Sequence, residues 1–222
     1  MNIKVKTINK EKPDISYKEI VDLIHESFQE RLKQGLHYSC SYITERQFVE
    51  KTKNGIVFIA IDTGTNTLVG TSTLNIHVNK GIKYGYMEYV AIRSNNKHSG
   101  IGTQLICTLK EKAKKNECAY ILSDTSTKAT SAVRYHLKNG FKIIGLESYR
   151  STNYWSYVFR MQIAPSRLWH NSLFLKFHYW NSYVFIKLTR NIDGTDTRLG
   201  FLYKRLKNYA RIDIKRAPRC KS

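Results

Sequence analysis

The sequence predicts an α/β (α+β) protein in which a central, mixed and twisted β-sheet is flanked by helices and followed by a basic helical extension. Two periodicities support this class, because some apolar segments alternate with a period of two and others recur at helical spacing. The middle of the chain has the order strand, helix, strand, helix, strand, which implies at least one parallel crossover in the sheet. With 222 residues, 41% of them hydrophobic, the chain is long enough for one sizeable core.

The first fifty residues predict one strand and two helices. Residues 3–8 largely alternate between apolar and polar side chains, as in a half-buried strand. Apolar residues recur at helical spacing from residue 17 to about residue 33, and Gly35 then ends the helix. Thr44, with Gln47 three residues later, has the pattern of a capping box and predicts the start of the second helix.

The next segment predicts three strands separated by turns. Residues 56–61 form an apolar run, residues 62–67 have turn-forming composition, and residues 68–76 return as the partner strand of a hairpin. Residues 81–85 predict a further turn, and residues 86–92 predict the third strand.

Two helices and three strands are predicted between residues 100 and 163. Residues 100–115 carry an apolar stripe opposite a lysine-rich face, and residues 131–138 form a helix that stops at an Asn-Gly pair. A short buried strand is predicted at 119–122, and two closing strands at 141–146 and 154–163. The predicted order of elements is therefore βααβββαβαββ.

The net charge of +20 is distributed unevenly along the chain. Residues 1–164 carry 24 basic and 14 acidic side chains, whereas residues 165–222 carry 13 and 3, so each part has an excess of +10. We therefore predict a domain at 1–164 and a basic, aromatic extension at 165–222. Such an excess favours anionic partners, namely a phosphorylated ligand, an acidic membrane surface or nucleic acid.

The cysteines and the N-terminal residues predict a cytoplasmic location. The four cysteines are scattered, which fits a reducing compartment, and no CxxC or Cys/His spacing predicts a metal site. The first ten residues lack the apolar run of a signal peptide. No stretch of about 20 residues is apolar enough to predict a membrane-spanning helix.

A glycine-rich turn connects the strand at 86–92 to the helix at 100–115. Its sequence is Lys97-His98-Ser99-Gly100-Ile101-Gly102. A helix start presents unpaired N–H groups and a partial positive charge, and glycine lets a ligand approach the backbone closely. With Lys97 beside it, the turn predicts a pyrophosphate site, although a ligand-free tight turn would use the same glycines. Neither the Walker pattern nor the Rossmann pattern fits, since no Gly-Lys-Ser/Thr follows and Leu105 replaces a third glycine.

Two motifs at a suitable separation resemble the GNAT acetyltransferase superfamily. The first motif of the family is Gln/Arg-x-x-Gly-x-Gly/Ala, and here it is Lys97-x-x-Gly100-x-Gly102, with lysine as the departure. The second is Ala-x-x-Phe-Tyr-x-x-x-Gly-Phe, which residues 132–141 match except that Tyr135 stands at the phenylalanine position and His136 at the tyrosine position. The resemblance covers about residues 1–163.

The resemblance implies that acetyl-CoA is the acyl donor and lies between two strands of the sheet. The backbone of Val90, Ala91 and Ile92 would pair with the pantetheine arm. The pyrophosphate would be held by the turn and the first helical turn, namely Lys97, His98, Ser99, Gly100, Ile101, Gly102 and Thr103.

Acyl transfer to an amine needs a neutral nucleophile, a stabilised oxyanion and, for the leaving thiolate, a proton donor. Glu88 is the only acid between Asp62 and Glu111, and strict alternation places it on the same face of its strand as Val90 and Ile92. We predict it to be the general base, acting through water. A structural ion pair with a lysine or arginine is the alternative.

Three interpretations are open for the residue that donates a proton to the leaving thiolate. His136 occupies the position of the family's tyrosine acid, and Tyr135 directly precedes it. Adjacent helical residues point about 100° apart, so only one of the two can face the sulfur. The third interpretation is that neither acts, since a thiolate is a fair leaving group.

The acceptor site and the role of the extension are less narrowly predicted. Phe28, Arg31 and Tyr38 are candidates for the acceptor wall over the first two helices, and they would equally suit ordinary surface and core positions. Beyond residue 163, apolar stripes predict two amphipathic helices. Through residues 165–210 these helices would pack on the domain or in a homodimer, contact an anionic membrane, or, as the least favoured option, bind nucleic acid.

We therefore predict an N-acetyltransferase that moves an acetyl group from acetyl-CoA to a primary amine by direct attack. The acceptor is a small molecule, an amino sugar or a peptide, and the protein is cytoplasmic or peripheral at the inner face of the membrane. The alternatives are a non-catalytic CoA-binding module and an O-acyltransferase or longer-chain acyltransferase.

Overall fold

The computed structural model describes residues 2–149, 152–165, 172–192 and 195–202. In this part of the chain the strands form one seven-stranded sheet in the order β1-β2-β3-β4-β5-β7-β6. Only β4 and β5 are parallel, and all other neighbours are antiparallel. The mixed sheet with a parallel crossover is thereby confirmed. The strands are β1 Ile3–Thr7, β2 Ile56–Asp62, β3 Thr67–Asn79, β4 Ile82–Ile92, β5 Tyr120–Ser126, β6 Lys142–Ser148 and β7 Trp155–Gln162.

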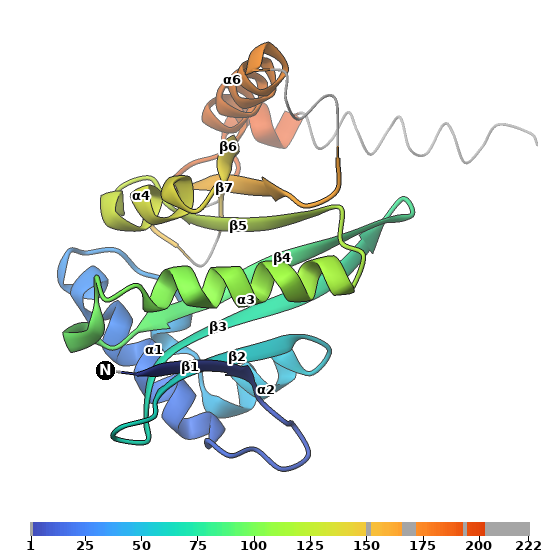
Figure 1. Ribbon diagram of the computed structural model, residues 1–222. Coiled ribbons are helices and arrows are strands. Elements are labelled where there is room, and N and C mark those ends of the chain that lie inside the picture. Colours follow the sequence, from blue (N-terminus) through green and yellow to red (C-terminus); the bar gives the residue numbers. More distant parts are fainter. Residues whose placement is uncertain (1, 150–151, 166–171, 193–194, 203–222) are drawn as a thin grey trace, which may run out of the picture.

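Helices cover both faces of the sheet (Figure 1). One face packs on α3 and the other on α1 and α2, and each face has its own apolar core. The helices are α1 Tyr17–Lys33, α2 Glu45–Thr52, α3 Ile101–Lys115, α4 Thr130–Lys138 and α6 Ser172–Thr189, with short 3-10 turns η1 Ser39–Tyr42 and η2 Ser94–Asn96.

Local sequence signals set the bounds of α1 and α2. Ser16 Oγ accepts from the N–H of Glu19 at 3.1 Å and begins α1, and Gly35, at φ +74°, follows its end. Thr44 and Gln47 form the predicted capping box, with N–H···O distances of 3.2 and 2.9 Å. Both predicted helices are confirmed.

Two strand boundaries were predicted wrongly. The turn expected at 81–85 lies instead at residues 80–81, because Asn79 pairs with Ile82 and the β3–β4 hairpin continues beyond the apolar residues. The strand expected at 119–122 extends to Ser126, since its polar second half pairs with β7. In both cases backbone pairing maintains the strand where side-chain polarity suggests a loop.

A β-bulge in β4 corrects the predicted grouping of its side chains. Thr71 pairs with Ala91 but Thr73 pairs with Glu88, so β4 contains one extra residue, and Tyr89 has φ +51°. Val90 and Ile92 pack in the core beneath α3, whereas the Glu88 carboxyl interacts with groups on α2 and η1. The prediction that Glu88 shares a face with Val90 and Ile92 is therefore wrong.

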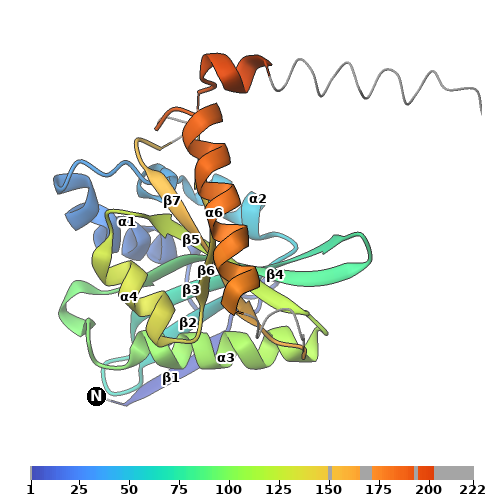
Figure 2. The same cartoon turned by 90° about the horizontal axis from the view of Figure 1, so that it is seen from above.

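The helix α6 packs against β6 at the edge of the sheet (Figure 2). Ser182 Oγ accepts from the N–H of Leu146 at 2.9 Å and donates to its carbonyl at 3.0 Å. Lys187 Nζ lies 3.0 Å from the centroid of the Trp155 ring. The first predicted helix of the extension is present, whereas of the second only residues 198–202 are described as helical. No helix within the described residues is long and apolar enough to cross a bilayer.

Candidate active site at the opening between β4 and β5

The strands β4 and β5 pair over a short distance and then separate. Their parallel register contains two pairs, Gly85 with Ile121 and Tyr86 with Leu122, although β4 continues to residue 92 and β5 to residue 126. The diverging edges carry backbone donors and acceptors that need partners. An extended ligand placed between the strands would supply them.

The backbone at the end of β4 is directed into this opening. Arg93 N–H donates to the carbonyl of Val69 on β3 at 2.9 Å, so the N–H of Ile92 points away from β3. It donates to Ser27 Oγ on α1 over a long 3.4 Å. Ile92 therefore stays a predicted ligand contact, with an N–H that makes only a long bond in the protein. Ala91 pairs with Thr71, and it and Val90 stay predicted ligand contacts.

The start of α3 has unpaired backbone donors beside the opening. Gly100 is the N-cap, at φ +85°, and neither a capping side chain nor an acid is present in the first turn. The N–H of Gln104 makes the first helical bond, to the carbonyl of Gly100 at 3.1 Å. The N–H groups of Ile101, Gly102 and Thr103 precede that bond and have no partner within the helix, so they are suited to an anion.

The other residues of the turn hold it in place. His98 adopts φ +68°, and Ser99 Oγ donates to the carbonyl of Asn96 at 2.6 Å. Lys97 Nζ forms an ion pair with Glu30 of α1 at 3.0 Å, and the hydrogen bond from Lys97 lowers the pKa of Glu30. Glu30 was not predicted from the sequence. Its contact fixes Lys97 between α1 and the helix start.

The second glycine of the motif is needed for packing as well. A Cβ atom at Gly102 would lie 2.7 Å from Tyr135 Cε2 and 3.0 Å from Ile92 Cδ1. The Tyr135 hydroxyl donates to the Gly102 carbonyl at 2.7 Å and so ties α4 to the first turn of α3. At Gly100, by contrast, a Cβ atom would meet nothing within 4 Å.

We expect Gly102→Ala to destabilise the protein by about 1–3 kcal/mol, because the new methyl group overpacks the contact with Tyr135. Chemical denaturation measures the free energy of unfolding. In a Tyr135→Ala background the same substitution should cost clearly less, since the ring is gone and only the 3.0 Å approach to Ile92 Cδ1 remains. An equal loss in both backgrounds would show that Tyr135 is not the cause.

Glu88 lies at the opening without a cationic partner. Asn75 Nδ2 donates to Glu88 Oε2 at 2.7 Å, and the side chain is partly buried. Burial raises the pKa of Glu88, the hydrogen bond from Asn75 opposes this, and the charge of Asp124 raises it further. No lysine or arginine among the described residues forms an ion pair with Glu88, so the alternative of a structural ion pair is not supported.

A second acid, Asp124, was missed from the sequence. It lies in the second half of β5, where Tyr86 Oη donates to Asp124 Oδ1 at 2.6 Å. Burial raises the pKa of Asp124, and the hydrogen bond from Tyr86 opposes that rise. The missed signal was an acid between Ser123 and Thr125, in a segment whose polarity suggested a loop.

Both ring nitrogens of His136 have partners in the protein. Nδ1 lies 2.8 Å from the Ala132 carbonyl, which can only accept, so Nδ1 carries the proton. Nε2, 3.0 Å from Ser123 Oγ, therefore accepts, and the ring stacks on Phe159 at 4.5 Å. Burial lowers the pKa of His136 and keeps it neutral. This geometry suits a core residue.

The hydroxyl of Tyr135 is likewise engaged, by the Gly102 carbonyl. Burial raises the pKa of Tyr135 well above its ordinary value. Of the three interpretations for the general acid, the contacts favour the one in which neither His136 nor Tyr135 acts.

Aromatic residues and a loop close the side of the opening that α1 covers. The Tyr38 ring lies 5.1 Å from Phe28 and 4.8 Å from Tyr154, and its hydroxyl is 3.2 Å from Thr125 Oγ1. Arg31 reaches across to Ser131 at the start of α4. The predicted residues Phe28 and Tyr38 thus lie together, whereas Arg31 links the two helices.

The connection between β6 and β7 also borders this side and was not predicted. Asn153 Nδ2 donates to the Gly35 carbonyl at 2.7 Å, and Asn153 Oδ1 accepts from the N–H of His37 at 3.0 Å. Tyr154 is buried beside Tyr38. The signal in the sequence was a polar, aromatic segment between the two closing strands.

Cys40, on η1, is close enough to interact with both Glu88 and Asp124. Burial raises the pKa of its thiol to about 12, so it is protonated at neutral pH and a poor nucleophile. Within the described residues, no three His, Cys, Asp or Glu side chains are placed to share a metal ion.

The fold of this chain is similar to that of acetyltransferases of known structure. An N-acetyltransferase from Staphylococcus aureus Mu50 has a TM-score of 0.57 at 20% identity, over 73% of this chain and 99% of its own. The PaiA N-acetyltransferase from Thermoplasma acidophilum, in complex with coenzyme A, has a TM-score of 0.58 at 16% identity, over 73% of this chain and 99% of its own. A chain of the NatC complex bound to Gag peptide and CoA has a TM-score of 0.57 at 17% identity. The match covers 74% of this chain and 100% of that one.

The sequence profile of the acetyltransferase (GNAT) family matches residues 17–141, more than half of the chain, and the protein therefore belongs to this family. The resemblance inferred from the two motifs is confirmed. A search of curated proteins gave no significant match.

Proposed function

We propose that the protein transfers an acetyl group from acetyl-CoA to a primary amine by direct attack, with Glu88 as the general base. The observation that carries the proposal is the position of Glu88: a partly buried carboxyl without a cationic partner among the described residues, at the opening of the sheet. A carboxyl that is readily protonated suits proton removal from an incoming ammonium group.

The donor is acetyl-CoA, in the opening between β4 and β5. The unpaired N–H groups of Ile101, Gly102 and Thr103 would bind its pyrophosphate, with Lys97 and the flanking His98, Ser99 and Gly100 around it. The backbone of Val90, Ala91 and Ile92 would pair with the pantetheine arm. Three solved acetyltransferases with this fold contain CoA or acetyl-CoA, which supports the assignment.

The reaction needs no covalent intermediate on the protein. Glu88 takes one proton from the ammonium group through water, and the neutral nitrogen then attacks the thioester carbonyl to give a tetrahedral oxyanion. Collapse of this intermediate breaks the carbon–sulfur bond, and the second proton lost by the nitrogen passes to water. The CoA thiolate leaves and takes a proton from water, because His136 and Tyr135 have no proton free to give. Cys40, held protonated, does not compete as a nucleophile.

Acetyl-CoA consumption across panels of small amines, amino sugars and peptides tests this proposal. Stable amide products, identified by mass spectrometry, would support N-acetylation. Ester products would favour an O-acyltransferase, and a preference for longer acyl-CoA would change the donor. CoA binding without turnover on any panel would favour the non-catalytic binding module.

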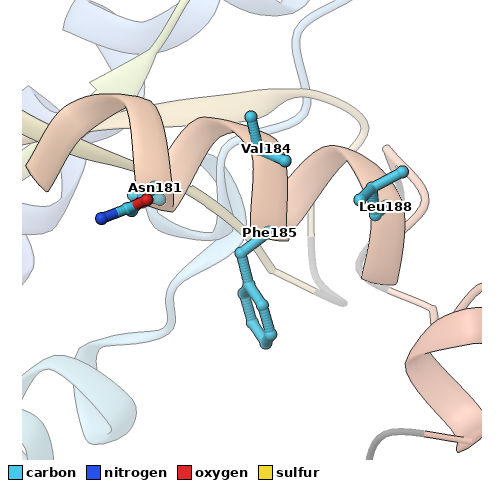
Figure 3. Close-up of a pocket in the computed structure, with 5 residues that line it drawn as sticks. Asn181, Val184, Phe185 and Leu188 are labelled. Atoms are coloured by element: carbon cyan, nitrogen blue, oxygen red, sulfur yellow. The ribbon is translucent and has the colours of Figure 1, made fainter. Parts of the chain in front are cut away.

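We further propose that the extension places the enzyme, in the cytoplasm, on an anionic membrane surface. The exposed side of α6 and the residues that follow it carry large apolar side chains, namely Phe177, Trp180, Val184, Phe185, Leu188, Ile192, Leu199, Phe201 and Leu202. Asn181, Ser182, Val184, Phe185 and Leu188 line a shallow, open hollow on α6 (Figure 3). An apolar surface of this kind favours a partner.

Charge favours a membrane over a second copy of the chain. Residues 165–222 have a net charge of +10, so a homodimer through this region would bring two such charges together. An anionic bilayer attracts the same charge and accepts the aromatic side chains at its interface. Residues 1–164 would then face the cytoplasm as the catalytic domain.

We expect the full chain to sediment with vesicles that contain about 30% phosphatidylserine and not with phosphatidylcholine vesicles. Phe177→Ser with Trp180→Ser should weaken binding about tenfold or more, because both side chains are mostly exposed, at 68% and 60%. Val78→Ser, at an equally exposed apolar position on β3, is the matched control. Equal sedimentation with both lipids, or a dimer by ultracentrifugation that the double variant abolishes, would contradict the membrane proposal.

A further inference from the structure

We propose that Asp124, held by Tyr86, is a positioning residue whose negative charge makes Glu88 a stronger base. This inference rests on the proposed role of Glu88 and adds a second acid from the neighbouring strand. The strands place the two carboxyls close together: Tyr86 pairs with Leu122, Glu88 and Asp124 each lie two residues beyond that pair, and the Tyr86 hydroxyl bonds to Asp124. They are on β4 and β5, the two strands whose pairing ends just before them.

The first step of the argument is that Asp124 has a fixed position. Tyr86 Oη donates to Asp124 Oδ1 over a short 2.6 Å, which is typical of a bond to a charged acceptor. Tyr149, from the segment after β6, interacts with Tyr86 and with Asp124. The bond from Tyr86 thus holds Asp124 in place, and no lysine or arginine of the described chain pairs with it.

The second step is that Asp124 acts on Glu88 through its charge. A negative charge nearby disfavours a second one, so Asp124 raises the pKa of Glu88, in the same direction as burial. Asn75 opposes both through its hydrogen bond. The other groups that interact with Glu88 are Cys40, Lys51, His77, Tyr89 and Tyr149. Those that interact with Asp124, besides Glu88, are Cys40, Tyr86, Tyr149, Tyr154 and Ser156.

The third step is the consequence for an incoming amine. An acceptor arrives mostly as an ammonium ion, and two carboxyls at one site attract it more strongly than one. Glu88 then takes the proton more readily, because protonation relieves its repulsion from Asp124. Asp124 itself stays ionised, keeps the bond from Tyr86 and takes no part in the proton transfer. Glu88 is therefore the base of the pair, and Asp124 supplies a negative charge at a fixed position.

Carboxyl ¹³C NMR titration of the full chain without substrate tests the pair, with the Glu88 signal assigned by its loss in Glu88→Gln. Asp124→Asn keeps the shape of the side chain and an oxygen that accepts from Tyr86. In this variant the titration midpoint of the Glu88 carboxyl should move to lower pH. Tyr86→Phe should move it in the same direction, because Asp124 loses the bond that stabilises its charge. The double variant should move it no further than Asp124→Asn alone.

The matched control is Asp62→Asn, at the end of β2, which should leave the midpoint of Glu88 unchanged. An unchanged midpoint in Asp124→Asn would overturn the inference, and so would a shift toward higher pH. If Asp124→Asn fails to fold, Tyr86→Phe decides in the same way. The titration requires no turnover, so it can succeed or fail independently of the proposed acetyl transfer. With an acceptor that the enzyme acetylates, kcat/KM should fall on the acid side of its pH profile. The pH of that fall should shift in each variant as the NMR midpoint of Glu88 does.

Discussion

Glu88→Gln should lower kcat by about 100-fold or more while the Kd for acetyl-CoA stays within about twofold. Glutamine keeps the shape of the side chain and can still bond to Asn75, but it cannot accept the proton from the amine. The proposed cofactor contacts lie on the backbone of β4 and at the start of α3, so acetyl-CoA binding should not change. Steady-state kinetics with the best acceptor amine, together with calorimetry for acetyl-CoA, measures the two quantities separately.

The control for this prediction is Glu50→Gln, an exposed acid of α2 that pairs with Lys53. It should leave both kcat and Kd unchanged. If Glu88→Gln turned over at the rate of the native protein with saturating substrates, Glu88 would not be the base.

The pH dependence of the rate adds a second check. Burial raises the pKa of Glu88, so the native rate should fall as the pH drops through that raised value and the carboxylate is protonated. In Glu88→Gln this limb should disappear.

Gly100→Val should weaken CoA binding by about tenfold or more. A β-branched residue at φ +85° is strained by about 1–2 kcal/mol, and its side chain would occupy the space that a pyrophosphate needs next to the backbone. Nothing in the protein lies within 4 Å of the new Cβ atom, so a loss of affinity would report on the ligand site and its loop. Calorimetric titration with CoA measures the change.

Gly81→Val provides a closely matched control. Gly81 has φ +77° and, like Gly100, open space around its missing Cβ atom, but it lies in the turn between β3 and β4. The two variants should lose comparable stability on thermal unfolding, and only Gly100→Val should lose CoA affinity. Equal CoA affinity in both variants would place the pyrophosphate elsewhere.

The sequence was sufficient for features that depend on local chemistry. The capping box of Thr44 and Gln47, the helix end at Gly35 and the turn from Lys97 to Gly102 follow from the preferences of single residues, and the structure contains all three arrangements. The family membership was predictable for the same reason, because its two motifs are local.

Features that depend on contacts between distant segments were not predictable in the same way. The bulge at Tyr89 depends on how β4 aligns with β3, and alternation alone placed Glu88 on the wrong face. Asp124 becomes a candidate only when Tyr86, 38 positions earlier, is brought within hydrogen-bonding distance. His136 occupies the motif position of the family's acid, yet Ser123 on β5 and Phe159 on β7 enclose its ring.

The central claim is that the first turn of α3 binds the pyrophosphate of coenzyme A. A crystal structure of the full chain with CoA tests it most directly. We predict phosphate oxygens within hydrogen-bonding distance of the backbone nitrogens of Ile101, Gly102 and Thr103, with the pantetheine arm between β4 and β5. CoA bound at another surface, with these N–H groups facing solvent, would contradict the claim.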